Sequence, residues 1–309
     1  MLLNNNHKII NYKSSFFESL KSSYENSFNK KFISRFVYEN RFGYKDKYSS
    51  YLLISAVDES VIGHIGFRIH NLNSKLKYKI AFRFSTFIVP RLRGSGIYLE
   101  FMNYVKNDLN AKFNVHFIYA WPNKINLLSC LKDKDYINLN PIITWQHKLG
   151  DTEIICEKKE MFTYKSLDFL NFEHTIITNE FGLTLDTKES YKSVFLSREN
   201  KEYKILAINK NRYAILGISY IDNKEFISII INNDLEIGFI LNVLKRYFKS
   251  NNIFVQCWCF HKDKNLLRQL IKLDFKQNGP VFYNGIYELT KVKFTINEYF
   301  PYMYNHDAF

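Results

Sequence analysis

Two arginines and two glycines lie within six residues, at Arg91, Arg93, Gly94 and Gly96. Residues 87–90 before them have the pattern of a strand end, and the pattern after them is helical. Glycines let a backbone approach an anion, a helix start presents unpaired N–H groups, and arginines add positive charge. The spacing therefore predicts a phosphate-binding loop, and the alternative is an ordinary strand-to-helix turn.

Strands and helices that position this loop are recognisable from the periodicity of apolar residues. A predicted antiparallel meander precedes the loop, and a helix, a strand and a short helix follow it. A short strand near Ile9 and two amphipathic helices come before the meander. The predicted ranges are 15–28 and 30–42 for the first helices, 51–57, 60–70 and 78–90 for the meander, and 98–109, 114–121 and 125–131 for the rest.

The second half of the chain repeats this order, with strands at 201–208, 212–221 and 224–231 and a helix at 235–249. Residues 126–136 align without gaps with residues 265–275, and five of the eleven positions are identical. The same offset of 139 places Pro141 opposite Pro280. The repeat predicts a duplicated α/β unit with mixed sheets, divided into domains 1–150 and 151–309 by a linker near residues 150–160.

Positive charge is concentrated in the first half. Residues 1–150 contain 22 Lys and Arg against 10 Asp and Glu, a net charge of +12, whereas residues 151–309 contain 21 against 20, a net charge of +1. Such asymmetry is expected of a domain that binds phosphates, nucleic acid or an anionic membrane surface. A solvated basic face is the alternative, and the charge alone does not choose among these.

Composition excludes several classes of protein. With 46% hydrophobic and 17% aromatic residues, the chain is globular rather than disordered. Its apolar runs are far shorter than the roughly 18 residues of a membrane helix, and three asparagines stand where a secretory signal has its apolar block, so we expect a cytoplasmic protein without a membrane partner. The four cysteines lack zinc-type spacing, which favours buried reduced thiols and no metal.

The pattern Arg91-x-x-Gly94-x-Gly96, between a strand and a helix, resembles the acyl-CoA pyrophosphate loop of the GNAT superfamily, the Gcn5-related N-acyltransferases. This resemblance implies tandem GNAT-like domains that use acyl-CoA as the acyl donor. The corresponding stretch of the second half, residues 231–238, has one glycine, no arginine and two carboxylates that would repel a pyrophosphate. We therefore expect one CoA site, in domain 1–150, and a degenerate second domain that serves as scaffold and acceptor-side wall.

The resemblance also assigns roles in binding CoA and in the reaction. Backbone N–H groups at the end of the third meander strand polarise the thioester carbonyl, and an asparagine lies near the start of the later short helix. That helix lacks the tyrosine with which many members protonate the leaving thiolate, so water or Ser129 is expected to assist. The expected CoA-binding residues are Ile88, Val89, Arg91, Arg93, Gly94, Ser95, Gly96, Ile97, Asn126 and Ser129.

A general base is harder to assign, because residues 78–90 contain no Asp or Glu. His64 and His70 share the more polar face of the second meander strand, and histidine has a suitable pKa. Glu39 is at a helix end that members of the superfamily often use to border the acceptor. A structural histidine and an exposed helical glutamate are the alternatives, and solvent water suffices for a weakly basic amine.

The acceptor is indicated by a more specific resemblance. The turn Trp121-Pro-Asn123 and the aromatic and basic residues before the meander are similar to those of GNAT enzymes that N-acylate nucleotide-linked, dTDP-type 3-amino-3,6-dideoxyhexoses with acetyl or a short hydroxyacyl group such as 3-hydroxybutyryl. Tyr38, Arg41 and Trp121 are the expected contacts with this acceptor. Another amine, such as an amino acid, a peptide or an aminoglycoside, and a non-catalytic basic binding module remain alternatives, although no nucleic-acid motif is present.

Overall fold

The computed structural model describes residues 6–42, 48–71, 78–150, 163–166, 176–177, 184–185, 202–209, 212–233, 235–248, 252–259, 264–279 and 281–290. The side chains of Arg41 and His70 fall outside this description, as do Cys156, Pro280 and the predicted linker after Gly150. The chain divides into two compact units. Met1–Leu139 and Asn284–Asn297 make up most of the first unit, and Asn140–Thr178 and Leu185–Tyr283 make up most of the second.

A mixed sheet organises the first unit. Strands β1 to β4 are antiparallel neighbours, and β5 is parallel to β4 because helix α3 (Ile97–Phe113) crosses between them. The strand order is β1 (His7–Asn11), β2 (Tyr48–Ser55), β3 (Val61–Asn71), β4 (Lys79–Ile88), β5 (Phe117–Ala120), β14 (Val281–Glu288) and β6 (Tyr136–Lys148).

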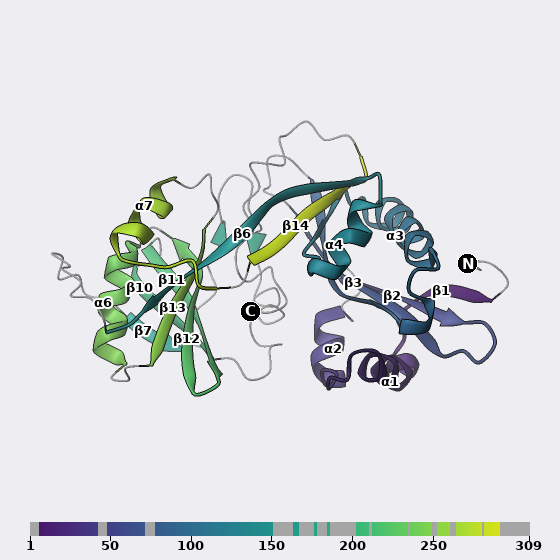
Figure 1. Cartoon of the computed structure of the whole chain (residues 1–309), viewed down its shortest axis with the longest axis horizontal. Helices are drawn as coiled ribbons and strands as arrows, with labels where there is room; N and C mark the ends of the chain where they lie inside the picture. Colours follow the sequence, from purple (N-terminus) through teal and green to yellow (C-terminus); the bar gives the residue numbers. More distant parts are fainter. Residues whose placement is uncertain are drawn as a thin grey trace. The chain divides into compact units, whose positions relative to one another are not determined.

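Helices cover both faces of this sheet, as Figure 1 shows for α1 (Phe17–Phe28) and α2 (Arg35–Phe42) on one side and α3 and α4 (Lys124–Leu131) on the other. Side chains alternate between the faces of a strand. Tyr51 of β2 therefore packs in the core with Phe101 of α3. The neighbouring Ser50 instead reaches α2, where its hydroxyl lies 2.6 Å from that of Tyr38.

The second unit has the same local order of a meander, a helix, a parallel strand and a helix. Its strand order is β6, β13 (Ile253–Cys259), β12 (Lys224–Asn233), β11 (Arg212–Ile221), β10 (Glu202–Asn209) and β7 (Thr163–Ser166), and its helices are α6 (Ile237–Tyr247) and α7 (Lys264–Lys272). Strands β12 and β13 are parallel, like β4 and β5. Two-residue strands, β8 (Ile176–Ile177) and β9 (Thr184–Leu185), form a separate small sheet. The predicted mixed α/β class and the repeated element order are thus confirmed.

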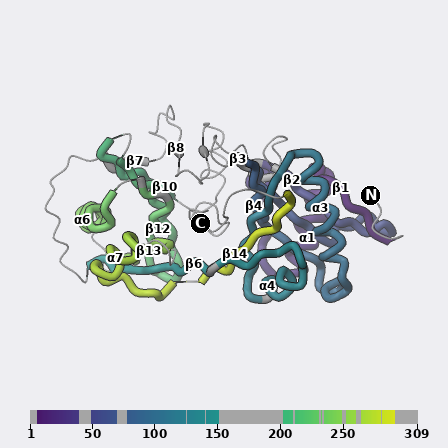
Figure 2. Tube along the Cα trace, turned by 90° about the horizontal axis from the view of Figure 1, so that it is seen from above, coloured from purple at the N-terminus to yellow at the C-terminus, as the bar shows by residue number. Residues whose placement is uncertain are grey.

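The predicted domain boundary lies between residues 150 and 151, but each unit includes a strand segment from the other side of it. Gly285–Glu288 of β14 pair antiparallel with Phe117–Ala120 of β5, in the first unit. Conversely, Ile143–Lys148 of β6 pair antiparallel with β13, in the second unit. Figure 2 shows the yellow C-terminal strand β14 among the blue strands of the first unit. The units therefore differ from the predicted ranges 1–150 and 151–309, because strand pairing between distant segments leaves no local sequence signal.

One predicted helix is shorter than expected. The sequence pattern predicted a helix over residues 30–42, but α2 begins at Arg35. Asn29 adopts a left-handed conformation (φ 51°) that ends α1, and Ser34 accepts a hydrogen bond from the N–H of Val37 at 3.3 Å, as an N-cap residue does. Polar residues at both positions, rather than apolar periodicity, set these limits. The cysteines that the structure describes, Cys130, Cys257 and Cys259, are buried free thiols, as predicted.

Candidate functional site

Strands β4 and β5 separate partway along their length. Their parallel pairing joins Ile80–Arg83 to Phe117–Ala120 and goes no further. Strand β4 continues to Ile88 beside β3, whereas the chain after β5 turns into α4. The separation leaves one edge of β4 facing a space between α3 and α4.

A β-bulge at Ser85 shapes β4 beside this opening. His64 pairs with Phe87 and Gly66 with Phe84, so β4 has one more residue than β3 between these pairs. Ser85 adopts φ 46°, and its carbonyl oxygen lies 2.5 Å from Nδ1 of His64. Because a carbonyl only accepts, Nδ1 of His64 carries a proton. Nε2 lies 3.0 Å from the hydroxyl oxygens of both Tyr38 and Ser50.

The bulge and the ladder that follows it direct the backbone of Ile88 toward the opening. The N–H of Val89 donates to the carbonyl of Ile62 at 3.0 Å. In an antiparallel ladder the polar groups of successive residues point in opposite directions, so those of Ile88 point away from β3. The Ile88 carbonyl accepts a hydrogen bond from Nε of Arg93 at 3.0 Å. Val89, which the sequence analysis paired with Ile88 as a polarising N–H, is thus engaged within the sheet.

Beyond β4 the segment predicted to bind phosphate begins with a short 3₁₀ turn, Pro90–Leu92, and leads into α3. Gly94 and Gly96 have φ 84° and 86°, a conformation that glycine adopts without steric cost. A Cβ added at either glycine would meet nothing within 4 Å, so open space adjoins both. Gly96 is the N-cap of α3, whose first-turn N–H groups therefore face the loop. Ser95 supports the turn by donating from its hydroxyl to the carbonyl of Leu92 at 2.8 Å.

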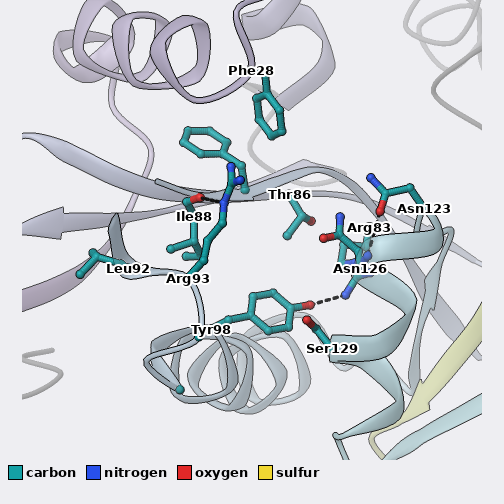
Figure 3. Close-up of a pocket in the computed structure, with 13 residues that line it drawn as sticks. Phe28, Arg83, Thr86, Ile88, Leu92, Arg93, Tyr98, Asn123, Asn126 and Ser129 are labelled. Atoms are coloured by element: carbon teal, nitrogen blue, oxygen red, sulfur yellow. Dashed lines mark hydrogen bonds between the residues drawn. The ribbon is translucent and has the colours of Figure 1, made fainter. Parts of the chain in front are cut away.

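A cavity of about 260 Å³ joins the loop to the opening between β4 and β5 (Figure 3). Of the predicted CoA-binding residues, it brings together Ile88, Arg93, Gly94, Gly96, Asn126 and Ser129. Arg91, Ser95, Val89 and Ile97 belong to the same turn without lining this cavity. Seven lining residues were not predicted, namely Phe28, Arg83, Thr86, Phe87, Leu92, Tyr98 and Asn123.

Arg83 is the most unusual of these seven. Its side chain is 7% exposed yet lines the cavity. Nη1 donates to the hydroxyls of Tyr98 at 2.5 Å and Tyr287 at 3.3 Å, and Nη2 donates to Sγ of Cys130 at 3.4 Å. Burial raises the pKa of both phenols, so these partners are neutral. This cluster has no signature in the sequence, because Arg83 lies within a strand pattern and Tyr287 is 204 residues away.

Asn123 and Asn126 belong to the start of α4. Asn123 is the N-cap residue, and its Oδ1 accepts a hydrogen bond from the N–H of Asn126 at 2.8 Å. Both amides line the cavity together with Ser129, one turn further along the helix. Asparagine is a preferred N-cap residue, so the turn Trp121-Pro-Asn123 in the sequence could have indicated that Asn123 begins this helix.

Of the predicted catalytic and acceptor residues, Tyr38, Glu39, His64 and Trp121 do not line this cavity. Tyr38 and His64 are fully buried and hydrogen-bonded to each other. Glu39 is half-buried, and its Oε1 accepts from the hydroxyl of Tyr12 at 3.2 Å. The ring of Trp121 stacks on Phe82, with centroids 5.6 Å apart. Arg41 belongs to α2, but its side chain lies outside the described part of the chain.

Comparison with solved structures places the fold. A GCN5-related N-acetyltransferase from Kribbella flavida aligns with a TM-score of 0.63 and 12% identity over 92% of this chain and 72% of its own. A probable N-acyltransferase from Enterococcus faecalis V583 aligns with a TM-score of 0.66 and 14% identity over the same shares. A tandem GNAT protein from the clavulanic acid biosynthesis pathway aligns with a TM-score of 0.54 and 7% identity, over 93% of this chain and all of its own. The chain therefore has the fold of GNAT proteins, including a tandem one.

At the level of sequence, no protein-family profile and no curated protein matches the chain. The described residues have two further features. None of their helices is both long and apolar enough to cross a bilayer. They also contain no group of three or more His, Cys, Asp or Glu side chains arranged to hold a metal ion.

Proposed function

We propose that this chain is an acyl-CoA-dependent N-acyltransferase. The observation that carries the proposal is the cavity that begins at an anion-binding loop and continues between two separating strands. Gly94, Gly96 and the start of α3 suit a pyrophosphate, because the glycines leave open space and the helix start presents N–H groups. Arg93 adds a cation whose Nε is already anchored on Ile88.

The rest of the donor fits the remainder of the cavity. The pantetheine arm, which carries two amides, would lie along the open edge of β4 beside the amide side chains of Asn123 and Asn126. The N–H of Ile88, which points to this side, would then bind a carbonyl of the arm, and the thioester would lie further along the cavity, away from the loop. Arg91, Ser95, Val89 and Ile97 support the loop in this proposal rather than contact the arm.

The second unit supports a single CoA site. The equivalent helix there, α6, has Glu236 as its N-cap residue. A carboxylate at that position opposes a phosphate, whereas α3 begins with an uncharged glycine. We propose that the second unit is a degenerate copy that serves as scaffold.

For the acceptor, we propose the amine of a nucleotide-linked 3-amino-3,6-dideoxyhexose, with acetyl or a short hydroxyacyl group such as 3-hydroxybutyryl transferred. The net charge of +12 in residues 1–150 supports an acceptor that brings a diphosphate in addition to that of CoA. Arg41 and Trp121 remain the proposed acceptor contacts. Tyr38 would act from within the core, by holding His64.

In the proposed reaction the amine attacks the thioester carbonyl directly, within a complex of both substrates. Glu39 is the proposed base because its carboxylate is half-buried, whereas both ring nitrogens of His64 are already hydrogen-bonded within the core. His64 instead positions the bulge at Ser85. A water molecule can take the proton where the amine is weakly basic.

Thiol release tests this assignment. Acetyl-CoA and 3-hydroxybutyryl-CoA are each incubated with the protein and a dTDP-linked 3-amino-3,6-dideoxyhexose, a lysine peptide or an aminoglycoside. We expect turnover with the sugar nucleotide and none in Gly94→Glu. Turnover with the peptide or the aminoglycoside alone would overturn the acceptor but keep the transferase, and no turnover together with no CoA binding would overturn both.

A further inference from the structure

The buried side chain of Arg83 lies at the inner end of the cavity. The guanidinium of Arg83 is held by two phenols and a thiol, from α3, β14 and α4. In the described part of the chain, no carboxylate forms an ion pair with Arg83. Asp133 and Asp135, which follow α4, are instead paired with Lys106, whose Nζ lies 3.2 Å and 2.7 Å from their oxygens.

Burying the Arg83 guanidinium in this way costs free energy unless an anion binds beside it. Arginine stays protonated in proteins, so its charge cannot be lost by titration. Taking an unpaired cation out of water costs several kcal/mol, and hydroxyl oxygens repay only part of that cost. A buried cation that opens into a cavity is therefore prepared for a negative charge on a ligand.

The position of Arg83 indicates which part of a ligand it would meet. Arg83 and Ile88 are five positions apart on β4, a distance of roughly 16 Å for an extended strand. In Figure 3, Arg93 and Leu92 lie on the loop side, and Arg83 lies on the other side beside Asn126 and Ser129. A ligand with its phosphates at the loop therefore points its far end toward Arg83. For acyl-CoA, that end carries the sulfur.

We propose that Arg83 is a catalytic residue that stabilises the thiolate of CoA as it departs, an inference that rests on the proposed function. The amine nitrogen forms the new C–N bond, the C–S bond breaks, and its electron pair remains on sulfur as a thiolate beside the guanidinium. The proton lost by the amine passes through water to the sulfur, which leaves as the thiol of free CoA. Helix α4 contains no tyrosine that could protonate the leaving thiolate. In this proposal the charge of Arg83 stabilises the thiolate instead.

The groups around Arg83 fit this role. Burial raises the pKa of Tyr98, Tyr287 and the nearby Tyr136, so that none of these phenols becomes the counterion itself. Tyr98 and Tyr287 fix the orientation of Nη1, and Cys130 that of Nη2. The charge remains available to the ligand.

Equilibrium binding tests the inference without an acceptor. CoA and desulfo-CoA, which lacks only the sulfur, are titrated into the protein between about pH 7 and pH 9, on both sides of the ordinary thiol pKa of about 8.5. If Arg83 lowers the pKa of the bound thiol by one unit, the preference for CoA over desulfo-CoA rises about six-fold across this range. The phosphates titrate in both complexes, so the ratio cancels their contribution.

Three variants complete the test. Arg83→Met is expected to abolish the rise, Arg83→Lys to retain part of it, and Arg35→Gln, an exposed arginine of α2, to leave it intact. Desulfo-CoA binding and thermal denaturation show whether each variant is folded. A ratio independent of pH in the unaltered protein would overturn the inference whatever the variants do, and so would an unchanged rise in Arg83→Met. If the unaltered protein bound neither CoA nor desulfo-CoA, the proposed function itself would be refuted.

Discussion

At the scale of single residues, the two arginines of the loop have different surroundings although both were predicted to bind the donor. Arg93 lines the cavity, and its Nε is held on the carbonyl of Ile88. Arg91 is exposed within the short turn and does not line the cavity. We therefore expect Arg93 to contribute more to CoA binding than Arg91.

We predict that Arg93→Gln weakens CoA binding roughly 10- to 100-fold, as expected when a hydrogen bond to a charged group is lost. Arg91→Gln removes the same charge from the same turn and should weaken binding less than about five-fold, through long-range attraction alone. Calorimetric titration of both variants with CoA measures the difference. Equal losses would mean that only the net charge of the loop matters.

Glycine and arginine spacing was sufficient to predict the loop, because the conformational need for Gly94 and Gly96 is local. The inner end of the cavity could not be predicted in this way. In the sequence, Arg83 is one polar residue within a strand pattern. Its burial depends on Tyr287, which is 204 residues further along the chain. The burial of Tyr38 and His64 was equally hidden, since it depends on the packing of α2 against β2 and β3.

At the scale of elements, the proposed function depends on where β4 and β5 are joined and where they separate. Hydrophobic periodicity predicted both strands, but not the bulge at Ser85 or the end of pairing at Arg83. Neither feature has a sequence signature, because a bulge requires only one extra residue relative to the neighbouring strand.

The joined ends of β4 and β5 are held by His116. Its backbone N–H donates to the carbonyl of Lys79 at 2.9 Å, and its Nδ1 accepts from the N–H of Lys79 at 3.1 Å. Burial, and then the charge of Lys79, hold the pKa of His116 below its ordinary value of 6.5. Neutral imidazole is thus favoured in the folded state, and its contribution is present above pH 6.5 and lost as the pH falls through the lowered value.

We predict that the free energy of unfolding falls more steeply on acidification in the unaltered protein than in His116→Asn, whose side-chain oxygen can still accept the hydrogen bond without titrating. Urea denaturation of both proteins at several values of pH below about 7 measures the two slopes. Parallel curves would show that protonation of His116 is not coupled to folding.

At the scale of the whole molecule, a strand from the end of the chain completes the first unit. Gly285 of β14 pairs with Ala120 of β5, and a Cβ there would lie 2.3 Å from the ring of Tyr136. Gly279 is a matched position in the second unit, where a Cβ would lie 2.5 Å from that of Thr144. The internal repeat predicted two similar units, whereas this contribution of β14 follows only from the pairing.

We predict that Gly285→Val and Gly279→Val each destabilise the unit they belong to by about 1 to 3 kcal/mol, through overpacking. Only Gly285→Val should also weaken CoA binding, because β14 supplies the Tyr287 that holds Arg83. Denaturation and CoA titration of both variants separate these effects. A greater loss of CoA affinity in Gly279→Val would contradict the assignment of β14 to the CoA-binding unit.

The central claim is that the loop after β4 binds the phosphates of CoA, and calorimetric titration of CoA tests it most directly. The comparison uses Gly94→Glu and Gly150→Glu, since both glycines have positive φ, 84° and 120°, and open space within 4 Å of an added Cβ. We predict micromolar binding at one site per chain, lost in Gly94→Glu through bulk and charge and retained in Gly150→Glu. No binding by the unaltered protein, or equal binding by all three, would contradict the account.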